Sequence, residues 1–375
     1  MIYLDYSATT PMSDEALQAY QKAANNFFGN SNSLHQFGQE AEQVLYLSRK
    51  SLSASLDMQP SECYFTGSGS EANFLALISL ALAYQHKGKH ILTTRCEHHS
   101  VLQAIYYLQT QGFSVTYVPV DKFGLITKKA LLESIQEETI LATFAHANSE
   151  LGTVQNLAML GKILAMKKIL FHSDCVQTYG KLKIPVEYLS SLSISAHKIY
   201  GPKGIGAAFI RSTLHWQSFL KGTTHEYGFR PGTVDVPSVV SFATAAETYL
   251  QESEADMKRL LNLRIRTIEA LSMNPSVVFE GHPTQRLPFH IGMRLKGIEG
   301  QLVMLECNRK GIAISTGSAC RAGQTAPPQS LLAIGRTTEE AHEFIRITFG
   351  KMTKDEDVEA LTKCISEITT NYGNG

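Results

Sequence analysis

The stretch "SAHKIYGPKGIG", residues 195–206, places a histidine and a lysine directly after the apolar run "SLSIS", residues 191–195. The run has the composition of a buried strand, and the Gly-Pro-Lys-Gly turn that follows would end it. A lysine in that place is either an ordinary solvated side chain, as most lysines are, or an amine held for Schiff-base chemistry. The rest of the chain decides between these two interpretations.

Around this stretch, from about residue 60 to 210, short β-rich runs alternate with helix-length segments such as "SEANFLALISLALAYQ". Several of the runs are apolar at nearly every position, as expected of strands buried on both faces. The alternation predicts an α/β domain with a mostly parallel, seven-stranded sheet. The strand candidates are "CYFTG", "HILTT", "SVTYVPV", "TILATFAHAN", "ILFHSD", "SLSISA" and "IGAAFI".

After about residue 250 the pattern changes, beginning with a long charged amphipathic helix, "ESEADMKRLLNLRIRTIEALS". Shorter strands ("LPFHIGMRL", "EFIRITFG") and two helical stretches follow, near 299–310 and from 355 onward. We therefore expect a large domain over 13–255 and a smaller α+β domain made of 1–12 and 256–375. In "MSDEALQAY", Ser13 is predicted to cap the start of a helix.

The composition limits the kinds of protein that this chain could be. Of 375 residues, 43% are hydrophobic and 18% charged, which predicts a sizeable core. Lys plus Arg equals Asp plus Glu, at 34 each, which argues against nucleic-acid or anionic-membrane partners. The N-terminus does not resemble a signal peptide, and the longest apolar run, "FLALISLALAY", is too short to span a bilayer, so a cytoplasmic location is expected. The six cysteines form no CxxC pair or zinc-like spacing, so no metal site is expected.

Polar residues follow several of the predicted strands, at the sheet edge where open parallel sheets bind ligands. "GSGSEAN" also opens a helix there, and backbone N–H groups at a helix start bind phosphate. Taken singly, each residue has a more ordinary explanation, such as a core histidine or a helix cap. Together a phosphate cradle, an imidazole, a carboxylate and an amine suit pyridoxal phosphate. These residues include Gly69, Ser70, Cys96, Glu97, His98, His99, His146, Asn148, Ser149, Glu150, Asp174, Gln177, His197 and Lys198.

Many motifs in one order resemble the class V branch of pyridoxal-phosphate enzymes and, within it, the cysteine desulfurases. The resemblance covers nearly the whole chain and implies the fold type I of pyridoxal-phosphate-dependent transferases. It points in particular to the NifS-like branch of Gram-positive bacteria linked to NAD biosynthesis. The motifs are "YLDYSATTP", "FTGSGSEAN", "EHHSVL", "HANSELGTVQN", "HSDCVQTYGK", "SAHKIYGPKGIG", "FRPGTVDVP" and "STGSAC".

The resemblance implies roles around the cofactor. Lys198 would hold the cofactor aldehyde and then act as a base, and Asp174 would keep the pyridine nitrogen protonated. Gln177 would contact the ring hydroxyl, and His98 would stack on the ring and carry protons. The phosphate would be held by Gly69, Ser70, Ser195 and His197 and, from the neighbouring subunit of a homodimer, by Thr233.

The resemblance also implies a reaction, the conversion of L-cysteine to L-alanine with sulfur left on Cys320 as a persulfide. Arg346 would bind the substrate carboxylate, a task that suits a bidentate guanidinium. The composition of "STGSACRAGQTAPPQS", residues 315–330, predicts a mobile loop around Cys320. The sulfur would serve iron–sulfur cluster assembly, with quinolinate synthase as the expected acceptor protein.

One position departs from the housekeeping relatives, which carry a second asparagine where this chain has Ser149. The shorter hydroxyl would tune the cofactor contact or leave room for a water. Two other functions remain open. Another class V reaction, such as transamination or selenocysteine lysis, would not need a persulfide-carrying cysteine. A catalytically dead docking protein would not need Lys198, Asp174 and Cys320.

Overall fold

The computed structural model describes residues 1–317 and 327–373. Its centre is a seven-stranded sheet with the order β2-β8-β7-β6-β5-β3-β4. The strands from β7 to β4 run parallel, whereas β8 is antiparallel to both β7 and β2, so the predicted mostly parallel sheet is confirmed. The strands are β2 (Cys63–Thr66), β3 (His90–Thr93), β4 (Ser114–Tyr117), β5 (Thr139–Thr143), β6 (Leu170–Asp174), β7 (Ser191–Ser195) and β8 (Gly206–Ile210).

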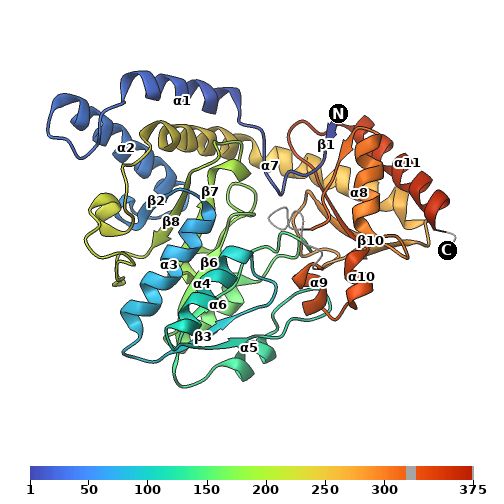
Figure 1. Ribbon diagram of the computed structural model, residues 1–375, viewed down its shortest axis with the longest axis horizontal. Helices are drawn as coiled ribbons and strands as arrows, with labels where there is room; N and C mark the ends of the chain where they lie inside the picture. Colours follow the sequence, from blue (N-terminus) through green and yellow to red (C-terminus); the bar gives the residue numbers. More distant parts are fainter. Residues whose placement is uncertain (318–326, 374–375) are drawn as a thin grey trace.

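All seven predicted strands are present, and the side chains of all but the edge strand β4 are largely buried. Every residue of β2, β3, β5, β7 and β8 is buried. Helix α3 (Gly69–Tyr84) is apolar on all sides, since it packs against β7, β8 and the helix α4 (His99–Thr110) at once. The helices α5 (Lys128–Ser134) and α6 (Leu157–Met166) complete this layered domain (Figure 1). Across the described parts of the chain, no helix has the length and apolar character needed to cross a membrane.

Helices α1 (Asp14–Asn26) and α2 (Gln36–Ala54) pack against the long helix α7 (Val236–Ser272). The predicted cap is confirmed, because the Ser13 side chain accepts from Ala16 N. Helix α7 begins sixteen residues earlier than the predicted start at residue 252, where the Asp235 side chain caps it through Ser238 N. It runs from the large sheet into the smaller part of the molecule (Figure 1), so the proposed boundary at residue 255 falls inside one continuous helix.

The smaller part contains an antiparallel sheet with the order β12-β10-β9. Two of its strands were predicted, and β9 was not. The first strand, β1 (Ile2–Tyr3), pairs in parallel with β11 (Ile312–Ala313) of this part. The other elements are β9 (Val277–Glu280), β10 (His290–Leu295), β12 (Phe344–Thr348), α8 (Gly300–Arg309), α9 (Gln329–Ala333), α10 (Thr338–His342) and α11 (Asp355–Tyr372).

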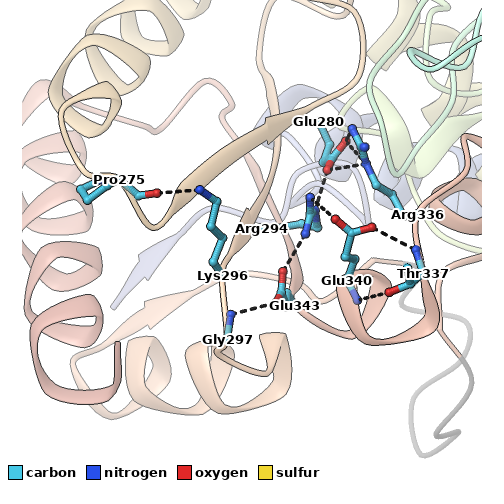
Figure 2. Close-up of polar contacts among 9 residues, drawn as sticks. All are labelled: Pro275, Glu280, Arg294, Lys296, Gly297, Arg336, Thr337, Glu340 and Glu343. Carbon is cyan, nitrogen blue, oxygen red and sulfur yellow. Dashed lines mark hydrogen bonds and ion pairs between the residues drawn. The ribbon is translucent and has the colours of Figure 1, made fainter. Parts of the chain in front are cut away.

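A cluster of ion pairs joins β9 and β10 to the α9–α10 region (Figure 2). The buried Arg294 side chain reaches Glu280 at 2.6 Å, Glu343 at 2.7 Å and Glu340 at 2.9 Å. Arg336, just after α9, also pairs with Glu280 at 3.0 Å. Because Glu280 and Arg294 are both nearly inaccessible to solvent, their charges are compensated by these ion pairs rather than by water. The cluster therefore fixes α10 on the small sheet.

Candidate active site

A cavity of about 130 Å³ lies at the carboxyl ends of β5, β6 and β7 and the start of α3. Most of the predicted site residues line it, although they come from segments far apart in the sequence. Among the described residues, no group of three or more His, Cys, Asp or Glu side chains could hold a metal ion. The predicted residues in the lining are Gly69, Ser70, His98, Ser149, Asp174, Gln177, Ser195, His197 and Lys198.

Lys198 ends the short 3-10 turn that follows β7, and its side chain lines the cavity. Its amine donates to the backbone carbonyls of Ser7 and Ala8, the latter at 2.8 Å. These carbonyls belong to the N-terminal segment, which also contacts His197 through Thr9 Oγ1 at 3.1 Å. The lysine is therefore a partly buried, oriented amine rather than an ordinary solvated side chain.

The carboxylate of Asp174, the last residue of β6, is fixed at both oxygens. Oδ1 accepts from Val176 N at 2.9 Å, and Oδ2 accepts from Asn73 Nδ2 at 2.8 Å. The Asn73 amide is oriented by His172, whose Nε2 lies 3.1 Å from Asn73 Oδ1. Burial lowers the pKa of His172 to about 3, so this ring is neutral and donates from Nε2. Sequence reasoning missed Asn73 and His172, although both lie inside the quoted motifs.

His98 caps the start of α4 with its own ring. Its Nδ1 accepts from Ser100 N at 3.2 Å, so the neutral ring carries its proton on Nε2. The Ser100 hydroxyl lies 2.8 Å from the same Nδ1 and accepts from Asn73 Nδ2 at 3.0 Å. Through Ser100 and Asn73, a continuous chain of hydrogen bonds thus links His98 to Asp174.

The start of α3 forms a cradle with the end of β7. A Cβ atom on Gly69 would lie 2.7 Å from Val176 Cγ2 and 3.1 Å from Ser195 Cβ, so only glycine permits this approach. The N–H groups of the first helical turn lack partners within the helix, which favours an anion there. Two buried polar atoms, Ser195 Oγ and Gln177 Oε1, have no hydrogen-bond partner within the described residues. A bound group with oxygen and hydroxyl functions would satisfy them.

His197 lies partly buried beside this cradle and among positive charges. Burial, and then the nearby charges of Lys198, Lys203 and Lys181, lower the pKa of His197 to about 3. The ring is therefore neutral at neutral pH and acts as a hydrogen-bonding group rather than as a cation. Its Nδ1 lies 3.1 Å from Thr9 Oγ1.

Arg346, on β12, does not line the cavity but lies directly behind its wall. Nη1 donates to the backbone carbonyl of Ser149 at 3.0 Å, and Nη2 donates to Asp5 Oδ1 at 2.7 Å. Thr233 is exposed in the segment before α7 and is absent from the lining of this cavity. Cys320 falls outside the described residues, as does the central part of the loop predicted around it, residues 318–326.

Glu97 is a buried carboxyl group next to His98. Its Oε1 accepts from Thr94 Oγ1 and its Oε2 from Ala145 N, both at 2.9 Å. These bonds tie the turn after β3 to the end of β5. Burial raises the pKa of Glu97 to about 8, with a smaller contribution from the Asp174 charge. The sequence placed Glu97 at a strand end but gave it no role.

The chain is similar in sequence and in fold to known proteins of one enzyme family. The Aminotransferase class-V family matches residues 2–361. A putative cysteine desulfurase NifS of Halalkalibacterium halodurans is 46% identical over 100% of this chain and 99% of its own length. The putative cysteine desulfurase NifS of Bacillus subtilis is 43% identical over 96% of this chain and 93% of its own length. A solved NifS-like protein superposes with a TM-score of 0.92 at 31% identity over 99% of both chains. The solved structure "SspA in complex with cysteine" gives a TM-score of 0.81 at 30% identity, over 93% of this chain and 99% of the other.

These similarities extend over the whole chain, and the fold matches them at the level of the seven-stranded sheet. The predicted fold type I is confirmed, and with it the predicted pyridoxal-phosphate dependence of the family. A desulfurase named IscS from Methanosarcina thermophila is also 38% identical over 100% of this chain and 93% of its own. The chain belongs to the class V aminotransferase family of pyridoxal-phosphate-dependent enzymes, among its NifS- and IscS-like cysteine desulfurases.

Proposed function

We propose that this enzyme converts L-cysteine to L-alanine and retains the sulfur on Cys320 as a persulfide. The observation that carries the proposal is the convergence of the Lys198 amine and the fixed Asp174 carboxylate on one cavity. A carboxylate for a pyridine nitrogen and an amine for an aldehyde are what pyridoxal phosphate requires of a protein.

The residues present fit that cofactor. Its phosphate would lie at the start of α3, near Gly69, Ser70 and the unpartnered Ser195 hydroxyl. Gln177 Oε1 would accept from its ring hydroxyl, and His98 would face the ring. When bound, pyridoxal phosphate supplies an aldehyde for the substrate amine and an electron sink for negative charge at the substrate Cα.

Within this site, the chain's own groups would move the protons. Lys198 would take the proton from the substrate Cα, because it lines the cavity and its amine is oriented by two carbonyls. Asp174 would hold a proton on the pyridine nitrogen, since Asn73 and Val176 N keep the carboxylate in place. His98 would carry a proton at Nε2, and Arg346 would bind the substrate carboxylate.

The transfer of sulfur to Cys320 needs no external oxidant. The Cys320 thiolate attacks the sulfur of the substrate, a new S–S bond forms, and the bond between Cβ and sulfur breaks. The electron pair of that bond stays on the carbon fragment, which takes up protons and leaves as alanine. The enzyme keeps Cys320–S–SH, and an external thiol reductant later releases the outer sulfur as sulfide.

We also propose a homodimer. The α1–α2 connection and the first turn of α2 expose three large apolar side chains, since Phe28 is 66%, Leu34 92% and Phe37 53% accessible. Clustered apolar side chains of this size are typical of protein interfaces. Thr233 is exposed and away from the cavity of its own chain, which agrees with a role in the site of a partner.

The sulfur acceptor is proposed from the resemblance to the NAD-linked branch. We infer that Cys320 delivers sulfur for iron–sulfur cluster assembly on quinolinate synthase. Because the net charge is zero, long-range attraction would contribute little to this encounter, and local contacts would select the partner. Supply of iron, cysteine and this enzyme to apo-quinolinate synthase or a general scaffold tests the choice. Equal rates of cluster formation on both would refute a dedicated acceptor.

The activity itself is tested with purified enzyme and L-cysteine. We expect stoichiometric alanine and, with a thiol reductant, sulfide, together with a persulfide found on Cys320 by mass spectrometry. A coloured protein whose turnover of L-cysteine survives loss of Cys320 would favour selenocysteine lysis or transamination instead. A protein that binds no pyridoxal phosphate would be the docking protein.

A further inference from the structure

The backbone carbonyl of Ser149 accepts two hydrogen bonds from the small sheet. Arg346 Nη1 reaches it at 3.0 Å, and His290 Nε2 lies 3.1 Å from it. The two donors come from neighbouring strands, because β10 and β12 pair with Gly292 opposite Arg346 and His290 opposite Thr348. Residues 290 and 292 point to the same face of β10, so the register brings both donors to one side of the sheet.

The direction of the His290 bond is fixed by Arg286. Nη2 of Arg286 lies 3.4 Å from His290 Nδ1 and can only donate, so Nδ1 is the acceptor and Nε2 carries the hydrogen. Burial and then the charges of Arg286 and Arg346 hold the pKa of His290 well below its usual range. The ring is therefore neutral and donates to Ser149 O.

The surroundings leave the His290 ring little freedom. Arg286 itself is fixed by the carbonyls of Glu280 and Leu151, both at 3.1 Å from its Nη atoms. On the other side, a Cβ on Gly152 would lie 2.5 Å from His290 Nδ1, and Gly152 has a φ of +76°. A glycine is thus needed both for the turn and for the approach of the ring. His290 is completely buried.

Arg346 depends on the same carbonyl. Its two Nη atoms bind Ser149 O and Asp5 Oδ1, and its buried Nε has no hydrogen-bond partner within the described residues. Ser149 O is therefore one of the two acceptors that set the plane of the guanidinium. The orientation of this plane sets the direction in which the N–H groups of Arg346 would donate to a bound carboxylate.

We propose that His290 is a positioning residue for recognition of the substrate carboxylate: by holding the Ser149 carbonyl, it fixes the guanidinium of Arg346. The inference rests on the proposed function, in which Arg346 binds that carboxylate. It adds a residue outside the cavity lining that acts only through the turn after β5 and through Arg346.

The test compares His290→Asn with His290→Gln in the cofactor-loaded enzyme. The glutamine amide reaches the position of Nε2, whereas the asparagine amide reaches only that of Nδ1, so the two variants differ in the bond to Ser149 O. Binding of L-cysteine and of cysteamine, which lacks only the carboxylate, is followed by the absorbance change of the bound cofactor. Arg346→Ala measures how much preference for L-cysteine over cysteamine remains when the guanidinium is absent.

We expect His290→Asn to lower the preference for L-cysteine over cysteamine by ~10-fold, or about 1.4 kcal/mol, through the affinity for L-cysteine alone. His290→Gln should stay within ~3-fold of the parent enzyme. Equal weakening of both ligands, or an unchanged preference in folded His290→Asn, would overturn the proposal. If Arg346→Ala keeps the full preference, the carboxylate site and this inference fail together, while alanine formation by the parent enzyme would still uphold the desulfurase.

Discussion

Nη2 of Arg346 lies 2.7 Å from Oδ1 of Asp5, although 341 positions separate the two residues in the sequence. The pair holds the N-terminal segment against β12, where Asp5 also forms a bridge with Thr348. Two residues further on, the carbonyl of Ser7 accepts from the Lys198 amine. One short segment therefore supports both the lysine proposed for the cofactor and the arginine proposed for the substrate.

The change Asp5→Asn removes the negative charge and leaves the Arg346 guanidinium, which is 2% exposed, without a counter-ion. Because an unpaired buried charge is costly, we expect the free energy of unfolding to fall by ~3 kcal/mol. Urea unfolding measures this as a lower midpoint with an unchanged slope. A midpoint equal to that of the parent protein would show that the ion pair contributes nothing.

The change Lys198→Ala should reduce alanine formation from L-cysteine by at least ~10²-fold, because the proposed base at the substrate Cα is lost. Lys183→Ala is the matched control, since Lys183 is an exposed lysine that is absent from the cavity lining. Near-normal alanine formation by Lys198→Ala would refute the assignment of the site.

The strands of the large sheet were predictable because a doubly covered parallel sheet buries nearly every residue, and the sequence shows this as continuous apolar runs. Strand β9 was not predicted, because only its last residue is fully buried and its position depends on pairing with β10. The early start of α7 was also missed. Its first turns pack on α1 and α2, so their stability comes from tertiary contacts rather than from a charged amphipathic pattern.

The site was predictable where a residue lies at the end of a strand, as Asp174 does, or in the turn after it, as Lys198 does. The residues that orient those groups were harder to find. Asn73 lies on α3 and His172 inside β6, and each is an ordinary buried polar residue until the fold brings it to Asp174. His290 comes from the other part of the molecule, and no spacing in the sequence connects it with Ser149.

In Cys320→Ser, the hydroxyl is a poor acceptor of sulfur, while the residues around the cofactor cavity stay unchanged. We expect normal cofactor binding, a spectral change on addition of L-cysteine and almost no persulfide. Mass spectrometry of the peptides that carry the five remaining cysteines provides the internal control. A persulfide of similar yield on another cysteine would contradict the role of Cys320.

The exposed hydroxyl of Thr233 is proposed to donate to the cofactor phosphate of a partner subunit. Thr233→Val keeps the shape and removes the donor, so cofactor affinity should fall by ~10-fold or more. Thr224→Val, at another exposed threonine in the preceding loop, is the control. Sedimentation should show a dimer for the parent protein and both variants, and a monomer that is fully active would exclude this arrangement.

Glu97 provides a test of the site's electrostatics. Its pKa is raised from 4.5 to about 8 by burial, so the folded protein holds a proton that the unfolded chain releases between these two values. A raised carboxyl pKa contributes stability that is complete below pH 4.5 and is lost as the pH rises through 8.

Glu97→Gln keeps the shape and most of the hydrogen bonds but does not titrate. We therefore compare the urea midpoints of the parent protein and Glu97→Gln. The midpoint of the parent minus that of Glu97→Gln should fall steadily between pH 5 and pH 8.5. Glu137→Gln, at an exposed position, should show the same dependence of the urea midpoint on pH as the parent protein. A difference between Glu97→Gln and the parent that stays constant over this range would mean that Glu97 is already ionised in the fold. The turn carrying His98 would then be held by a charged carboxylate accepting from Thr94 and Ala145 N, and no stability would depend on its protonation.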